Sequence, residues 1–125
     1  MQHVYHRRVH FADTDAAGVV HFSRLLCYAE EAEHELLEGL GIPLLADGGW
    51  PRVHVDCSYN SPARMGDRVE VSLAVEKLGK TSVTWVFSMT VDSRNIATGS
   101  MRTVRVDGGG SPVELNDSWR NLLLG

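Results

Sequence analysis

Residues 19–40 read VVHFSRLLCYAEEAEHELLEGL, and this stretch determines which architecture the chain can form. Its apolar side chains recur every three or four residues, which is the spacing of one face of an α-helix. That face consists of Phe22, Leu25, Leu26, Ala29, Ala32, Leu36, Leu37 and Leu40. Glutamates occupy the other faces, and Gly39, Gly41 and Pro43 supply a stop signal. We predict one long helix that packs its apolar face against a large, flat partner.

The partner predicted for this helix is a β-sheet, because the flanking segments alternate apolar and polar side chains. Residues 3–11 form the first strand, with Val9 and Phe11 among the side chains expected on its buried side. Four more strand signals follow the helix, at residues 52–59, 69–75, 83–91 and 96–106. The economical architecture is an α+β fold in which a five-stranded antiparallel sheet wraps around one long central helix. Residues 108–110 are expected to be a flexible link, and residues 116–124 a short helix or tail.

The length and composition are those of an ordinary globular protein. With 125 residues the chain is expected to be a single domain, spanning residues 1–125. The formal net charge of -4 provides no basic field, which disfavours nucleic acid as a partner. The two cysteines lack a C-x-x-C spacing and are expected to be free thiols. The sequence has neither a run of ~20 apolar residues nor a secretory leader, so we expect a cytoplasmic protein without membrane insertion.

Two motifs carry a resemblance to a known family. Residues 11–20, FADTDAAGVV, resemble the signature of the 4-hydroxybenzoyl-CoA thioesterase family: an aromatic residue, any residue, Asp, any residue, Asp, a small residue or Pro, a small residue, Gly, any residue and Val. Residues 58–69, SYNSPARMGDRV, are similar to the second marker of that family, in which Pro and a Gly-Asp pair open the next strand. The resemblance implies a hotdog fold, self-association as a homodimer or homotetramer, and hydrolysis of an acyl-CoA thioester at sites between paired subunits.

The second Asp of the first motif, Asp15, matches the catalytic carboxylate of the family. The resemblance therefore implies that Asp15 attacks the thioester carbonyl as a nucleophile or activates water as a general base. Free N–H groups before a helix can stabilise the negative charge that develops on the carbonyl oxygen. The candidates for this polarisation are the backbone N–H groups of Gly18, Val19 and Val20, whereas Asp13 is expected to cap the helix.

Two further side chains are candidates for an auxiliary role. His21 lies in the first predicted turn, one position before the catalytic His of some relatives, where this sequence has Phe22. A second branch of hotdog thioesterases uses a Glu on the helix, and Glu31 is the candidate for that role. A zinc-protease motif is incomplete, because His34 is followed four residues later by Glu38 and not by a second His. No metal site is therefore expected.

Coenzyme A would belong to the substrate, so no separate cofactor is expected. Its phosphates require Arg or Lys side chains at the entrance of the site. By residue type alone the candidates are Arg64, Arg68, Arg102 and Arg105. For each of them taken singly, scattered surface charge is the simpler interpretation.

Two other functions are compatible with a hotdog fold. A hotdog dehydratase would need a paired His and acidic residue, and the His and Pro-Gly pattern of that family at the helix entry is absent. A non-catalytic acyl-CoA binding module would keep the fold but would not need Asp15. Within the enzyme hypothesis, the first motif together with residues 20–23 is similar to that of thioesterases that release aromatic acids such as 1,4-dihydroxy-2-naphthoate or 4-hydroxybenzoate. Hydrolases of short-chain aliphatic acyl-CoA share nearly the same motif, and we rank the aromatic class slightly ahead.

Overall fold

The computed structural model describes residues 2–125, which contain two α-helices, a short 3-10 helix and seven strands. In chain order these elements are β1 (Gln2–Arg8), η1 (Phe11–Asp13), α1 (Phe22–Gly39), β2 (Gly48–Gly49), β3 (Arg52–Tyr59), β4 (Arg68–Leu78), β5 (Ser82–Val91), β6 (Arg94–Val104), β7 (Val106–Asp107) and α2 (Asp117–Leu124). Five strands form an antiparallel sheet in the order β1-β4-β5-β6-β3, and β2 pairs with β7. The predicted five-stranded antiparallel sheet is therefore confirmed.

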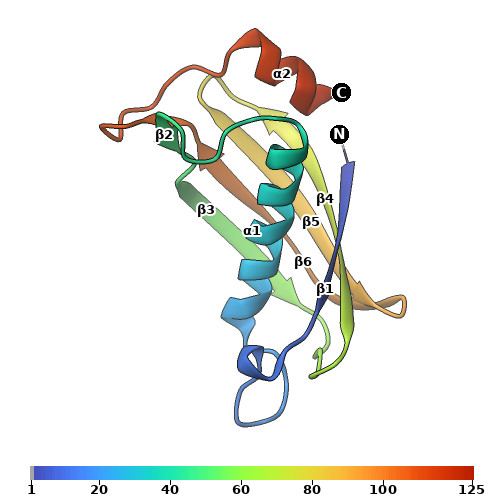
Figure 1. Ribbon diagram of the computed structural model, residues 1–125. Helices are drawn as coiled ribbons and strands as arrows, with labels where there is room; N and C mark the ends of the chain where they lie inside the picture. Colours follow the sequence, from blue (N-terminus) through green and yellow to red (C-terminus); the bar gives the residue numbers. More distant parts are fainter. Residues whose placement is uncertain (1) are drawn as a thin grey trace.

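Helix α1 lies across one face of this sheet, with β1 and β4 on one side of it and β3 on the other (Figure 1). The core fills the space between the helix and the sheet. Alternation along β5 is complete, since its buried side chains are Val83, Trp85, Phe87, Met89 and Val91. Because successive side chains of a strand point to opposite faces, this strand alone supplies five core residues to the face under α1.

The predicted helix is present but differs from the prediction in three respects. It starts at Phe22, three residues later than expected, and the side chain of Phe22 is exposed. Tyr28 and Glu33, which interrupt the predicted apolar stripe, are buried. The short helix predicted at residues 116–124 is present as α2, which lies at the opposite end of the molecule from the start of α1 (Figure 1). Within residues 2–125, neither helix has the length and apolarity needed to cross a bilayer.

The first strand and the glycine-rich segment also differ from the prediction. β1 ends at Arg8, because residues 11–13 turn into η1 and leave Phe11 79% exposed. Residues 108–110 form a tight turn, in which the amide of Gly110 donates to the carbonyl of Asp107 at 3.0 Å. The carboxylate of Asp107 also accepts from the amide of Gly109 at 2.9 Å. This segment is therefore hydrogen-bonded, where the sequence indicated a flexible link.

Arg105 is buried between α2 and the segment that follows α1. It is 4% exposed, and its guanidinium lies 5.3 Å from the ring centroid of Trp50 and 5.1 Å from that of Trp119. It also donates to the carbonyls of Pro43 and Ala46. These contacts join α2 to the segment after α1. The expectation that Arg105 could hold a phosphate at the entrance of the site is therefore wrong.

Gly99→Ala is expected to lower the free energy of unfolding by at least about 2 kcal/mol, because β6 has no room for a methyl group there. An added Cβ would lie 2.2 Å from the carbonyl oxygen of Asp56 and 2.7 Å from Cζ of Phe87. Urea denaturation of both proteins measures the difference. Gly39→Ala is the control, because a Cβ at this helical position meets no atom within 4 Å and should stabilise the protein slightly. Equal stability of Gly99→Ala and the parent would contradict this packing.

Candidate active site

Residues 14–21 join η1 to α1 and form a closed loop at one end of the molecule, which we call the Asp15 loop (Figure 1). Its stem is held by the amide of Asp15, which donates to the carbonyl of Val19 at 2.9 Å. Its tip is held by the amide of Gly18, which donates to the carbonyl of Asp15 at 3.0 Å. Gly18 has a φ of 78°, a conformation that glycine adopts without the strain of a Cβ.

The carboxylate of Asp15 is exposed at the tip of this loop. Its Oδ1 accepts from the amide of Ala17 at 2.8 Å, and no donor within residues 2–125 contacts its Oδ2. Asp15 lines a cleft of about 520 Å³. The other lining residues are Val19, Val20, His21, Phe22, Leu25, Tyr59, Asn60, Ser61, Pro62 and Ala63. One carboxylate oxygen is thus available to a molecule bound in the cleft.

Backbone N–H groups of residues that line the cleft are also available. The amide of Gly18 is used within the loop, and that of Val20 donates to the carbonyl of Ala63 at 2.8 Å. By contrast, the amides of Val19 and Phe22 have no acceptor in the described part of the chain. Of the three N–H groups expected to polarise a carbonyl, only that of Val19 is therefore free. The amide of Phe22 was not among the predicted groups, and it lacks an intrahelical acceptor because Phe22 is the first residue of α1.

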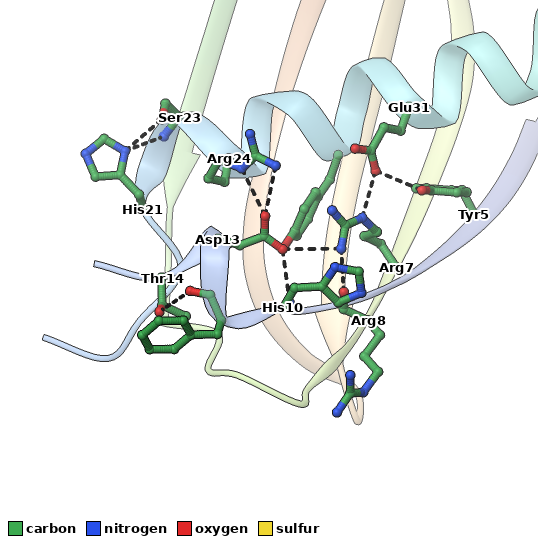
Figure 2. Close-up of polar contacts among 12 residues, drawn as sticks. Tyr5, Arg7, Arg8, His10, Asp13, Thr14, His21, Ser23, Arg24 and Glu31 are labelled. Carbon is green, nitrogen blue, oxygen red and sulfur yellow. Dashed lines mark hydrogen bonds and ion pairs between the residues drawn. The ribbon is translucent and has the colours of Figure 1, made fainter. Parts of the chain in front are cut away.

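His21 is the N-cap of α1, a role that the sequence assigned to Asp13. Its Nδ1 accepts from the amide of Ser23 at 3.3 Å and lies 2.7 Å from the Ser23 hydroxyl (Figure 2). Because Nδ1 is an acceptor, the proton of the neutral ring is on Nε2. His21 lines the same cleft as Asp15.

Two aromatic side chains form a wall of the cleft. Phe22 is 57% exposed and Tyr59 is 46% exposed, although both are large and mainly apolar. Their ring centroids lie 6.1 Å apart with an interplanar angle of 78°, which is the edge-to-face arrangement. Burial and the neighbouring Cys57 raise the pKa of Tyr59 to about 12, so its phenol is neutral at pH 7. The wall therefore carries no charge.

Asp13 directly precedes the Asp15 loop and is a buried ion. Its carboxylate is 1% exposed and accepts from the Tyr28 hydroxyl at 2.7 Å, the His10 amide at 3.0 Å, Arg24 Nε at 3.0 Å and Arg7 Nη1 at 3.2 Å (Figure 2). Burial would raise the pKa of Asp13, but the hydrogen bonds of Tyr28, His10 and Arg24 and the charge of Arg7 lower it to about 2. Asp13 is therefore an ionised residue that joins β1 to α1 through hydrogen bonds, and the prediction that it caps the N-terminus of α1 is wrong.

Glu31 is not brought together with Asp15. Its carboxylate accepts from the Tyr5 hydroxyl at 2.8 Å and from Arg7 Nε at 3.0 Å (Figure 2). Partial burial and the hydrogen bond to Glu31 raise the pKa of Tyr5 to about 12. Because Glu31 does not line the cleft and is already engaged, the geometry offers it no contact with a thioester bound beside Asp15.

The arginines proposed for phosphate binding are scattered. Arg64 is exposed and forms an antiparallel bridge with Val19, which places it beside the cleft. Arg68 of β4 pairs with Arg8 of β1, near one edge of the sheet. Arg102 of β6 pairs with His54 of β3, near the opposite edge. Of the three, only Arg64 adjoins the cleft that contains Asp15.

A further arginine at the cleft was missed in the sequence. Arg94 Nη1 donates to the hydroxyl of Ser61 at 2.8 Å and to the carbonyl of Pro62 at 2.7 Å, and both of these residues line the cleft. The two contacts span more than thirty positions of sequence, so no local pattern could have indicated them. Within residues 2–125 no group of three His, Cys, Asp or Glu side chains is arranged to hold a metal ion.

Comparison with known proteins assigns the family. The model of the thioesterase superfamily matches residues 17–97, which is more than half of the chain. The chain belongs to the thioesterase superfamily. This superfamily assignment confirms the resemblance found in the two sequence motifs. The matched residues include the second half of the Asp15 loop and all of α1, β3, β4 and β5.

Curated relatives of this thioesterase-superfamily chain include enzymes named for one aromatic thioester. The 1,4-dihydroxy-2-naphthoyl-CoA hydrolase of Synechococcus sp. (strain CC9605) is 33% identical over 111 residues, covering 81% of this chain and 74% of the relative. The enzyme of the same name from Crocosphaera subtropica is 39% identical over 82 residues, covering 62% of this chain and 60% of the relative. A putative esterase of Aquifex aeolicus is 37% identical over 107 residues, and the match covers 82% of each chain.

Solved structures share the fold of this superfamily member. A gentisyl-coenzyme A thioesterase superposes with a TM-score of 0.87 at 30% identity, covering 98% of this chain and 99% of that one. A 1,4-dihydroxy-2-naphthoyl-CoA thioesterase from Synechocystis superposes with a TM-score of 0.90 at 24% identity, covering 99% and 96% of the two chains. The hotdog thioesterase fold expected from the motifs is therefore confirmed, with the five-stranded sheet and α1 as its main elements.

Proposed function

We propose that this protein is an acyl-CoA thioesterase that hydrolyses an aromatic acyl-CoA to the free acid and coenzyme A. The observation that carries the proposal is that Asp15, Val19 and Phe22 line the same cleft, with one carboxylate oxygen of Asp15 and the amides of Val19 and Phe22 left without a partner in the described part of the chain. Membership of the thioesterase superfamily supports the reaction type. The names of the relatives, which act on dihydroxynaphthoyl-CoA and gentisyl-CoA, support the acyl class.

The chemistry proposed for the cleft uses both groups. The thioester carbonyl oxygen accepts from the amides of Val19 and Phe22, which stabilise the negative charge of the tetrahedral intermediate. Asp15 Oδ2 then either attacks the carbonyl carbon or removes a proton from the water that attacks it. If Asp15 attacks, the C–S bond breaks to leave an acyl anhydride on Asp15, and water then cleaves this anhydride to release the acid and restore the carboxylate. If water attacks, its oxygen bonds directly to the carbonyl carbon as the C–S bond breaks. In both routes the coenzyme A thiolate leaves and takes up a proton. His21 Nε2–H is an auxiliary donor at the same cleft.

The aromatic class is supported by the wall of the cleft. Phe22 and Tyr59 are exposed in the free chain, and a planar ring packed against this pair would bury apolar surface and make aromatic contacts. Val20 and Leu25 add apolar side chains to the same cleft. The neutral phenol of Tyr59 can also hydrogen-bond to a hydroxyl group on the substrate ring.

A panel of acyl-CoA substrates tests this proposal. Release of the coenzyme A thiol would be followed with benzoyl-, naphthoyl-, butyryl- and hexanoyl-CoA at equal concentrations. We expect the two aromatic thioesters to have the larger kcat/KM. Preference for butyryl- or hexanoyl-CoA would replace the aromatic class by the short-chain aliphatic one. Binding of acyl-CoA without cleavage of any thioester would indicate a non-catalytic binding module.

Replacing either aromatic residue of the wall should weaken the preference for aromatic substrates. Phe22→Leu and Tyr59→Leu are each expected to lower kcat/KM for benzoyl-CoA by about 3- to 10-fold, since an aromatic pair contributes about 0.5–1.5 kcal/mol. The kcat/KM for butyryl-CoA should change less than twofold. An equal loss on both substrates would show that the wall does not select the acyl group.

The same cleft suggests how coenzyme A is held. We assign Arg64 and Arg94 to its phosphates, because both adjoin residues of the cleft. Arg68 and Arg102 lie on other parts of the sheet and are not included.

We also propose that the chain self-associates through β3. This strand is an edge of the five-stranded sheet, and it exposes Val53, Val55 and Tyr59. Exposed edges of this kind readily pair with a second strand. Multi-angle light scattering of the parent and of Val55→Lys tests the proposal, with a dimer or larger assembly expected for the parent and a smaller species for the variant. A parent that is monomeric at assay concentrations would contradict it.

A further inference from the structure

We propose that Asp13 is the positioning residue of this site: it ties both ends of the Asp15 loop to β1 and α1, and so holds the Asp15 carboxylate against the free amides of the cleft. The inference rests on the proposed function of Asp15. Asp13 itself does not line the cleft, so it acts through the loop and not on the substrate.

The side chain of Asp13 fixes the start of the loop. Asp13 directly precedes the loop, and its carboxylate binds one element on each side. Arg7 of β1 donates to its Oδ2 at 3.2 Å. From α1, Tyr28 donates to Oδ2 at 2.7 Å and Arg24 Nε donates to Oδ1 at 3.0 Å. The first residue of the loop is therefore attached to a carboxylate that is anchored by a strand and by the first two turns of the helix.

The backbone of Asp13 fixes the end of the loop. Its carbonyl accepts from the amide of His21, the last loop residue, at 2.9 Å. Its own amide donates to the carbonyl of His10 at 3.0 Å. Entry and exit of the loop thus meet at one buried residue, and Asp15 lies two positions beyond it.

An ionised carboxylate suits this position better than any neutral side chain. Asp13 and Glu31 carry two negative charges that balance Arg7 and Arg24 in one connected cluster (Figure 2). In all four of its hydrogen bonds the Asp13 side chain is the acceptor. An asparagine of the same shape would present its NH₂ group to some of these donors and leave them unpaired. The low pKa of Asp13 is consistent with a permanently charged anchor.

Asp13→Asn tests the proposal. With benzoyl-CoA we expect kcat to fall 10- to 100-fold and KM to change less than threefold, because a carboxylate displaced by about 1 Å loses reactivity without losing the rest of the substrate contacts. Hydrogen exchange should accelerate at the amides of Asp15 and His21, which close the loop, and not across β4 and β5. A variant with kcat within twofold of the parent and unchanged exchange would overturn the proposal.

Two further variants separate positioning from stability. Glu33→Gln also neutralises a buried carboxylate, held by Arg52 at 2.9 Å further along α1, and should leave kcat unchanged well below its melting temperature. Tyr28→Phe removes one donor to Asp13 and keeps its charge, so kcat should fall several-fold at constant KM even if Asp13→Asn does not fold. An unchanged kcat in Tyr28→Phe, or an equal loss in Glu33→Gln, would overturn the positioning role. A parent that cleaves no thioester would instead overturn the proposed function.

Discussion

Asp15→Asn is expected to lower kcat for an aromatic acyl-CoA by about a thousandfold or more while the protein stays folded. Asparagine has nearly the same shape, and its side-chain oxygen can still accept from the amide of Ala17, which now lies 2.8 Å from Oδ1. The loop should therefore persist. What is lost is the negative charge and the free oxygen that attacks the carbonyl or takes the proton of water. Steady-state release of the coenzyme A thiol measures the effect.

Asp107→Asn is the matched control for this change. Asp107 makes the same kind of turn, since its Oδ1 accepts from the amides of Gly109 at 2.9 Å and Ser111 at 3.0 Å, and it lies outside the cleft. We expect its kcat to equal that of the parent. If Asp15→Asn were as active as Asp107→Asn, the catalytic carboxylate would have to be sought elsewhere.

Arg52→Met is expected to lower the free energy of unfolding at pH 7 by about 3 kcal/mol, the second large effect. Glu33 is fully buried, and Arg52 Nη1 donates to its Oε1 at 2.9 Å. Its Oε2 is buried without a hydrogen-bond partner within residues 2–125. Removing Arg52 would leave the buried carboxylate of Glu33, on the inner face of α1, without a compensating charge. Urea denaturation curves of the two proteins measure the loss.

The pH dependence of this loss has a defined sign. Burial raises the pKa of Glu33, an effect that the charge of Arg52 opposes. A carboxyl group whose pKa is raised on folding favours the folded state at low pH, and that advantage is lost as pH rises through the raised pKa. Without Arg52 the pKa should rise further, so Arg52→Met should regain stability as pH falls toward the ordinary Glu value of about 4.3. The double variant Arg52→Met with Glu33→Gln should lack this regain, and a regain that persisted there would contradict the assignment to Glu33.

The parts of the structure that could be predicted are those governed by local periodicity. The alternation of Val83, Trp85 and Phe87 was enough to place β5 and its buried face, and β3 spans the predicted residues 52–59. The apolar stripe likewise predicted α1. In each case the burial of one face follows from the spacing of side chains along the chain itself.

The parts that could not be predicted depend on contacts between distant segments. Asp13 and Glu33 look like surface residues in the sequence, but both are buried, because Arg7 and Arg52 reach them from β1 and β3. A charged residue becomes stable in a core only through such partners, and spacing alone does not reveal them. Arg94 likewise adjoins the cleft only through a hydrogen bond to a residue distant in sequence, Ser61.

The candidate site was predicted in part for the same reason. The motif predicted Asp15 and Val19 as site residues, and both line the cleft. The free amide of Phe22 was missed because the helix was expected to start earlier, and the capping role of His21 was assigned to Asp13. Which backbone amides are free depends on where a helix begins, and sequence patterns place helix ends only to within a few residues.

The most direct test of the proposed active site is a crystal structure of Asp15→Asn with an intact aromatic acyl-CoA bound. We predict that the thioester carbonyl oxygen lies within hydrogen-bond distance of the amides of Val19 and Phe22, with its carbon next to the side chain of residue 15 and its ring against Phe22 and Tyr59. A thioester bound with its carbonyl away from these amides, in a protein whose parent cleaves the same substrate, would contradict the assignment of this cleft as the active site.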